Sequence, residues 1–138
     1  MALQSLGLIG FGSIATLLVE VLAERLPAPL ARCHVLVRPG TPDERISTIE
    51  TACGAMADHV TVHADGDAFR QADVQLAIEC AGHGAVDDQV AALLRAGCET
   101  IVTSVGALGD DALYERLVAA ADAGSTRLVI PAGAIGAL

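Results

Sequence analysis

The chain alternates short apolar runs with stretches in which apolar residues recur every three to four positions. The first pattern predicts buried strands, and the second predicts amphipathic helices that cover them. We expect strands near 3–9, 32–37, 59–63, 74–79, 99–104 and 127–131, and helices near 13–25, 42–53, 65–71, 84–96 and 110–123. Six strands separated by five helices predict an α/β fold of the Rossmann type, a doubly wound parallel sheet with strand order 3-2-1-4-5-6. Its ligand crevice is expected at the carboxyl ends of the first and fourth strands.

Local signals mark several of the expected helix ends. The segment 41–44 has the arrangement of a capping box, with Thr41 as the N-cap and Glu44 at the third helical position. Gly97 and Gly124 follow the two later helices, where a left-handed C-terminal residue is favoured. Since no linker, repeat or low-complexity segment interrupts the pattern, residues 1–138 are expected to form one domain.

Composition and charge narrow the class of protein. The chain has 138 residues, of which 53% are hydrophobic, enough for the core of a single domain. A formal charge of −9 with only eight basic residues argues against nucleic acid and against an anionic membrane surface, because both attract clustered Lys and Arg. No apolar stretch approaches the roughly 20 residues of a membrane span, and the start of the chain lacks the pattern of a signal peptide. A cytoplasmic protein is therefore expected.

The cysteines and histidines form no recognisable metal or disulfide motif. His59 and His63 flank a short alternating run, and no third ligand accompanies them at a metal-binding spacing. No pair has the Cys-x-x-Cys spacing, so we expect reduced, mostly buried thiols at Cys33, Cys53, Cys80 and Cys98.

A glycine-rich turn joins the first expected strand to the first expected helix, with the sequence Gly10-Phe11-Gly12-Ser13-Ile14-Ala15. Gly10 permits the tight turn, Gly12 lets the backbone approach a phosphate, and the helix N-terminus presents unpaired N–H groups to an anion. The last residue stands where the pattern accepts Gly or Ala. We expect residues 10–14 to bind the pyrophosphate of a dinucleotide. The alternative is that these glycines only make a tight turn.

The end of the second expected strand bears on the choice between NAD and NADP. An acidic residue there would hydrogen-bond the ribose 2′-OH and repel a 2′-phosphate, but this chain has Arg38 at that place. A guanidinium suits bidentate contact with phosphate, so either NAD or NADP is expected to bind. The alternative is that Arg38 is a solvated charge near the adenine that selects no phosphate.

A second small-residue turn, Cys80-Ala81-Gly82-His83, follows the fourth expected strand and faces the same crevice. Small residues there leave room for the nicotinamide ring, and His83 would orient the ring or the substrate. A nucleophilic pair is the alternative, with Cys80 as thiolate and His83 as base. Glu79 is expected either to be paired inside the crevice or to cap the turn.

Three strand ends together carry a more specific signal. The segments 79–83, Ser-Val-Gly-Ala-Leu at 104–108 and Gly-Ala-Ile-Gly-Ala-Leu at 133–138 follow the glycine-rich turn in this order. In this they resemble the L-aspartate dehydrogenase family over essentially the whole chain. We expect Val105 and Gly106 among the cofactor contacts, and the resemblance places Ala134 at the nicotinamide end.

The resemblance implies an NAD(P)-dependent oxidoreductase that interconverts L-aspartate and iminoaspartate. The imine then hydrolyses to oxaloacetate and ammonia or feeds NAD biosynthesis. The resemblance also implies a two-domain homodimer whose catalytic histidine lies in the second domain. In this chain that histidine is expected beyond residue 138, so no catalytic residue is assigned within 1–138. Without substrate positioning and acid–base help, the cofactor half alone is expected to be almost inactive.

Two other hypotheses stay open. The chain could belong to a related oxidoreductase that acts on another small acid or semialdehyde, which a substrate panel would reveal. It could also be a non-catalytic dinucleotide sensor, which would change its oligomeric state on binding and show no turnover.

Overall fold

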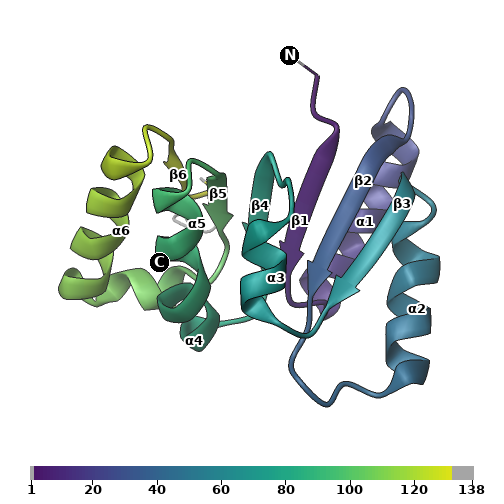
Figure 1. Ribbon diagram of the computed structural model, residues 1–138, viewed down its shortest axis with the longest axis horizontal. Helices are drawn as coiled ribbons and strands as arrows, with labels where there is room; N and C mark the ends of the chain where they lie inside the picture. Colours follow the sequence, from purple (N-terminus) through teal and green to yellow (C-terminus); the bar gives the residue numbers. More distant parts are fainter. Residues whose placement is uncertain (1, 132–138) are drawn as a thin grey trace.

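The computed structural model describes residues 2–131 and shows one parallel sheet with helices on both faces (Figure 1). The strands are β1 (Ser5–Ile9), β2 (Leu30–Leu36), β3 (Ala57–His63), β4 (Leu76–Glu79), β5 (Glu99–Val102) and β6 (Leu128–Val129). The α-helices are α1 (Ser13–Arg25), α2 (Asp43–Cys53), α3 (Gly66–Gln71), α4 (His83–Ala85), α5 (Ala91–Arg95) and α6 (Asp111–Ala123). A π-helical turn, η1 (Val86–Val90), joins α4 to α5, and a 3₁₀-helix, η2 (Val105–Gly109), precedes α6.

The strand order is β3-β2-β1-β4-β5-β6, which confirms the predicted Rossmann topology. Every neighbouring pair is parallel, and Leu8 of β1 lies opposite Val35 of β2 and Ile78 of β4. The chain winds outward from β1 to β3 and then returns to place β4 on the other side of β1. The carboxyl ends of β1 and β4 therefore form the switch point where ligands bind in this architecture.

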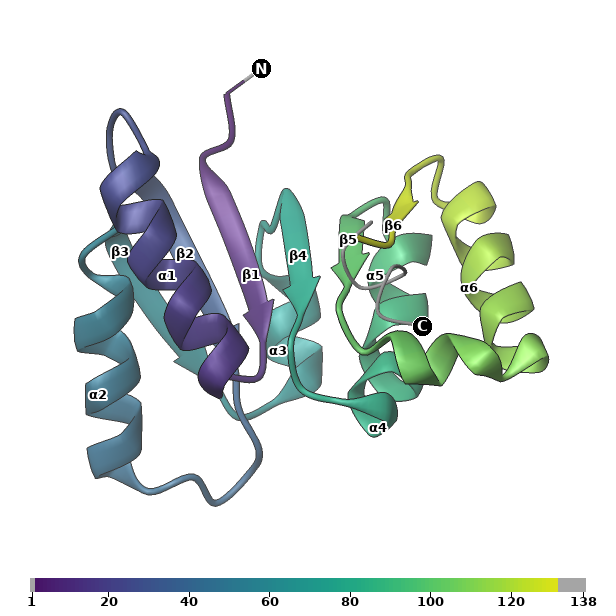
Figure 2. The same ribbon diagram turned by 180° about the vertical axis from the view of Figure 1, so that it is seen from behind.

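Helices cover the sheet on both faces, so the central strands are apolar without alternation. All five residues of β1 are buried, as parallel strands packed on both sides require. Leu8 packs in a core with Ile49 of α2, whereas the next residue, Ile9, packs in a second core with Phe69 and Leu94. In Figure 2, α1 and α2 lie in front of the sheet and α3 lies on the far side. Among residues 2–131, none of the helices combines the length and the apolar character needed to cross a membrane.

The predicted elements begin and end within two residues of the observed ones, but two segments differ in detail. The helix expected at 84–96 is interrupted by η1, whose wider turn buries Val86 and Val90 in the core. The strand expected at 99–104 ends at Val102. It ends there because the Ser104 N–H donates to the Glu79 side chain instead of extending the ladder (3.0 Å).

The predicted capping box at the start of α2 is wrong. Pro42 is the N-cap residue, and no side chain caps the helix. The Thr41 hydroxyl instead donates to the Arg38 carbonyl at 2.6 Å, and the Thr41 N–H donates to the same oxygen. This hydroxyl therefore closes the turn after β2 and is not available to the helix.

The two glycines predicted as left-handed C-caps behave differently. Gly97 has φ +90°, which confirms the prediction, but Gly124 is right-handed with φ −88°, and the left-handed residue is Ser125 with φ +53°. Gly124 is needed for a different reason, since a Cβ there would lie 1.8 Å from the Leu94 carbonyl oxygen. The close approach of the two chain segments thus requires glycine at 124.

Candidate functional site

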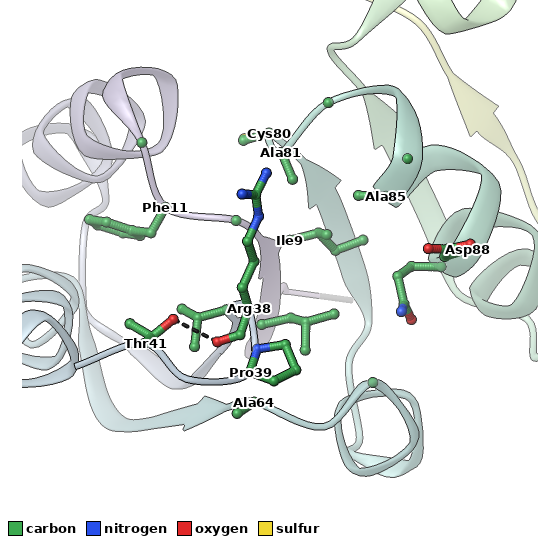
Figure 3. Close-up of a pocket in the computed structure, with 18 of the residues that line it drawn as sticks. Ile9, Phe11, Arg38, Pro39, Thr41, Ala64, Cys80, Ala81, Ala85 and Asp88 are labelled. Carbon is green, nitrogen blue, oxygen red and sulfur yellow. Dashed lines mark hydrogen bonds between the residues drawn. The ribbon is translucent and has the colours of Figure 1, made fainter. Parts of the chain in front are cut away.

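A pocket of about 820 Å³ lies at the carboxyl ends of β1, β2 and β4, at the predicted switch point (Figure 3). Its volume is in the range that suits a cofactor or other small ligand. The glycine-rich turn, the segment after β2 and the turn after β4 supply most of its walls. Its described lining falls within residues 9–89, which is mainly the first half of the fold. The lining includes Gly10, Phe11, Gly12, Arg38, Arg45, Cys80, Ala81, Gly82, Asp88 and Gln89.

The two glycines of the turn after β1 have separate structural roles. Gly10 has φ +84°, and a Cβ there would lie 2.7 Å from the Ala81 Cβ, so both conformation and space require glycine. A Cβ on Gly12 would meet no protein atom within 4 Å. The protein's own packing therefore does not demand glycine at 12, whereas a ligand lying against this backbone would.

The N-terminus of α1 is free to receive an anion. Gly12 is its N-cap residue, with no side-chain cap and no acidic residue in the first turn. By contrast, Asp65 caps α3 and Asp110 caps α6, each accepting a backbone N–H. The first N–H groups of a helix lack intrahelical partners and carry partial positive charge. An uncapped start beside an open glycine thus fits the pyrophosphate of a dinucleotide.

Two arginines line the pocket on the side of β2. Figure 3 shows Arg38 extending across the pocket, with its guanidinium toward Cys80 and Ala81. Arg45 of α2 donates to the Phe11 carbonyl, and its guanidinium carbon lies 5.8 Å from the centre of the Phe11 ring. Neither forms an ion pair with a carboxylate among residues 2–131. Sequence reasoning missed Arg45, although its place in the first turn of a helix that starts at the crevice was a usable signal.

Glu79, left open by the sequence, caps the turn after β4. Its side chain is fully buried and accepts the N–H groups of Ala81 and Gly82, both at 2.8 Å. It also accepts the N–H of Ser104 at 3.0 Å and the hydroxyl of Ser104 at 2.8 Å. The carboxylate therefore holds the pocket turn and ties it to the end of β5.

The described cysteines are free thiols, as predicted. Burial, and to a lesser extent the charge of Glu79, raise the pKa of Cys80 to about 11. Burial likewise raises the pKa of Cys98 to about 11. The thiolate is the nucleophilic form, so these values disfavour the alternative in which Cys80 attacks a substrate.

Three predicted site residues, Ser13, Ile14 and Gly106, lie outside the pocket lining described above. Ser13 and Ile14 open α1, and the Ile14 side chain is 54% exposed. His83 is the first residue of α4, and Val105 and Gly106 begin η2 after β5. Ala134 lies outside the described residues.

A histidine pair that the sequence did not predict lies on neighbouring strands. His34 Nδ1 of β2 is 3.0 Å from His63 Nε2 of β3, and His63 packs edge-on against Phe69. Burial lowers the pKa of both rings, and the charge of His63 further lowers that of His34. Within residues 2–131, no three His, Cys, Asp or Glu side chains are grouped as a metal site would require.

The strand order, with a glycine-rich turn at its switch point, defines the chain as an α/β domain of the Rossmann class. The chain belongs to the family described as "Homoserine dehydrogenase, NAD binding domain", whose model matches residues 10–131.

Individual relatives carry a more specific name. The chain is 35% identical to L-aspartate dehydrogenase 1 of Bordetella parapertussis over 94% of its length, and it covers 45% of that protein. The predicted resemblance to L-aspartate dehydrogenases is therefore confirmed. The chain spans less than half the length of the curated relatives it matches.

Solved structures with the same fold include two informative neighbours. Biliverdin reductase from Synechocystis, in complex with biliverdin and NADP⁺, matches with a TM-score of 0.71 and 16% identity, covering 92% of this chain and 37% of that one. Aspartate dehydrogenase from Thermotoga maritima matches with a TM-score of 0.58 and 19% identity, covering 95% of this chain and 46% of that one. At these identities the likeness concerns the fold alone.

Proposed function

We propose that this chain is the cofactor-binding half of an NAD(P)-dependent L-aspartate dehydrogenase. The observation that carries the proposal is the uncapped N-terminus of α1 beside the open backbone of Gly12, at the switch point of a Rossmann sheet. The similarity to L-aspartate dehydrogenases over nearly the whole chain supports the choice of reaction. The reaction is the oxidative deamination of L-aspartate to iminoaspartate, which hydrolyses to oxaloacetate and ammonia.

Different walls of the pocket would bind different parts of the dinucleotide. The N–H groups at Gly12, Ser13 and Ile14 would hold the pyrophosphate, and Arg38, which follows β2, would lie near the adenosine ribose. When bound, the nicotinamide supplies the acceptor for hydride from the substrate carbon.

The second half of the sheet is proposed to hold the nicotinamide. The turn from Cys80 to His83, together with Val105, Gly106 and Ala134, follows the strands of that half. Cys80 takes part through its small, neutral thiol and not as a nucleophile.

The Arg38 and Arg45 side chains favour NADP as a cofactor alongside NAD. Both line the pocket, and the segment 36–42 that leaves β2 contains no carboxylate. A guanidinium attracts a 2′-phosphate, whereas the acidic residue typical of NAD-selective sites would repel it.

The remaining parts of the enzyme are proposed from the family resemblance. A substrate domain after residue 138 would supply the catalytic histidine and the aspartate site, and the whole protein would be a cytoplasmic homodimer. Free thiols at all four cysteines agree with a reducing compartment. The product imine would enter NAD biosynthesis or be hydrolysed.

The first test is a titration of the chain with NADH and with NADPH, followed by the fluorescence of the cofactor. The protein has no Trp to interfere with that signal. Saturable binding of either cofactor supports the proposal, and binding of neither contradicts it. With the substrate domain supplied, L-aspartate should then drive reduction of the oxidised cofactor. Turnover of a different small acid, but not of aspartate, would favour a related oxidoreductase.

A further inference from the structure

We infer that Glu79 is a positioning residue for the nicotinamide half of the cofactor site, acting through the turn after β4 and the end of β5. The inference rests on the proposed function, because it assumes that the pocket binds a dinucleotide. It assigns a role to a buried carboxylate that lies behind the pocket wall and does not line it.

The Glu79 carboxylate joins two strand ends of the same half of the fold. One oxygen accepts the Ala81 and Gly82 N–H groups and the Ser104 hydroxyl, and the other accepts the Ser104 N–H. The backbone of Glu79 adds a second link, since its carbonyl oxygen accepts a hydrogen bond from the Thr103 hydroxyl at 2.7 Å. The two loops that begin at β4 and β5 are therefore held in one arrangement by one residue, mainly through its side chain.

The position of the turn after β4 matters to the pocket because this turn lies directly against the glycine-rich turn after β1. A Cβ on Gly10 would approach the Ala81 Cβ to 2.7 Å, so the two turns are in close contact with no room for a side chain between them. Gly82 lies in the left-handed region, with φ +128°, and its N–H is one of the two held by Glu79. A shift of this turn would narrow or open the crevice on the β4 side, because residues 80–82 line it there.

The chemistry requires a carboxylate, because all four hydrogen bonds are donated to it. An amide at 79 keeps one acceptor oxygen but presents an N–H₂ group to at least one of the same donors. One backbone N–H would then face another donor in a buried place, which is costly. Glu79→Gln is nearly isosteric, so it removes the hydrogen-bond pattern without creating a cavity.

The two halves of a Rossmann fold bind the two halves of the dinucleotide. The strand ends β1 and β2 carry the adenosine and pyrophosphate contacts, and Glu79 organises β4 and β5. Disturbing Glu79 should therefore weaken the binding of the whole dinucleotide more than that of ADP-ribose, which lacks the nicotinamide. A purely structural role would weaken both ligands alike or neither.

The experiment compares the affinities for NADH and ADP-ribose by calorimetry, in wild type and in three variants. Glu79→Gln removes the acceptor pattern, Ser104→Ala removes one of its four donors, and Leu117→Val makes a smaller side chain in the core of α6, away from the pocket. We expect Glu79→Gln to bind NADH at least tenfold more weakly, with ADP-ribose affinity within twofold of wild type. Ser104→Ala should show a smaller loss with the same selectivity, and Leu117→Val should show none.

Equal losses for the two ligands in Glu79→Gln, or no loss for either, would overturn the inference and leave the proposed function standing. If wild type binds neither NADH nor ADP-ribose, the proposed function fails and the inference fails with it. Should Glu79→Gln not fold, Ser104→Ala decides: a selective loss of NADH affinity supports the inference, and unchanged affinity overturns it.

Discussion

The glycine-rich turn contains two glycines with different requirements: the fold requires Gly10, whereas a ligand would require Gly12. Gly10 is fixed by its positive φ and by contact with Ala81, so its replacement is a problem for folding. Gly12 has open space where a side chain would stand, so its replacement is a problem only for a ligand. The sequence motif alone gives both glycines equal weight, and the distinction comes from the structure.

Gly12→Val is expected to fold and to lose cofactor affinity by at least about tenfold, because a branched side chain would occupy the approach of the pyrophosphate. Its free energy of unfolding should change by no more than about 1 kcal/mol, since a Cβ at this position meets no protein atom within 4 Å. Gly10→Ala provides the contrast and should lose roughly 2–4 kcal/mol of stability through backbone strain and overpacking. Urea denaturation and NADH titration measure the two quantities. Full NADH affinity in Gly12→Val would remove the phosphate role of this loop.

Arg38→Asp is expected to weaken NADPH binding more than NADH binding, because it replaces a phosphate donor with a carboxylate that repels the 2′-phosphate. A charged hydrogen bond contributes about 1.5–3 kcal/mol, so the affinity ratio should shift roughly tenfold to a hundredfold. Arg95→Asp makes the same change in net charge on an exposed residue of α5 outside the described pocket lining, and should leave the ratio unchanged. Equal losses for both cofactors in Arg38→Asp would make this arginine a bystander to phosphate selection.

At the scale of helices and strands, apolar periodicity predicted the elements well because each one buries a defined face. The bounds predicted for α1, 13–25, match the observed ones, since a glycine starts the helix and its apolar residues repeat regularly. Two of the errors fall where a polar group had two possible partners, at Thr41 and at Ser104. Thr41 could cap α2 or close the turn after β2, and it does the latter. Periodicity carries no information about that competition.

In the candidate site, too, some features could be predicted from the sequence and others could not. The glycine-rich turn, Arg38 and the turn after β4 follow strand ends, and strand ends of a parallel sheet meet at one edge, so their place in the pocket was predictable. The place of Arg45 in the first turn of α2 was a usable signal, but its hydrogen bond to the Phe11 carbonyl depends on the angle of α2. The hydrogen bonds of Glu79 depend on the relative height of β4 and β5. Those distances arise from tertiary packing, which a single sequence does not encode in readable form.

The histidine pair on β2 and β3 should make stability depend on pH. The pKa of His34 and of His63 is lowered, mainly by burial, although Asp73 and Asp65 act in the opposite direction and Arg32 reinforces the shift at His34. A lowered pKa means that the unfolded chain binds protons more readily than the folded one. This contribution to stability is therefore complete above the usual value of 6.5 and is lost as the pH falls through the lowered pKa values.

The urea midpoint of wild type should accordingly fall between pH 7.5 and pH 5, and His63→Gln should show a shallower decline. His59→Gln, which changes an exposed histidine on the same strand, serves as the matched control and should follow wild type. Parallel profiles for wild type and His63→Gln would show that the pair does not contribute to the pH dependence.

Over the whole molecule, an acidic chain places two of its few basic side chains at the pocket. The chain carries a formal charge of −9, and four of its eight basic residues, all arginines, are engaged in ion pairs with neighbouring carboxylates. Arg38 and Arg45 face the pocket instead. Under the proposed function, positive charge beside the uncapped start of α1 would attract the phosphates of the cofactor to an otherwise acidic protein.

The whole domain also presents an apolar face that the described residues leave uncovered. Ile14, Leu17 and Val21 recur on one side of α1, and Leu17 is 62% exposed. In Figure 2 no other helix or strand of residues 2–131 lies over the outer side of α1. Contiguous exposed apolar groups of this kind mark contact surfaces, so this chain by itself should self-associate through α1 as its concentration rises.

Sedimentation at increasing concentration tests that expectation with two matched variants. Leu17→Lys places a charge in the middle of the face, where Glu20 can pair with it one turn along the helix, and should shift the chain toward monomer. Val118→Lys makes a comparable change on α6, where Val118 is 38% exposed, and should leave association unaltered. If Val118→Lys dissociates the protein and Leu17→Lys does not, the contact lies on α6. A wild-type chain that stays monomeric at high concentration would mean that the α1 face alone is too small to hold two copies together.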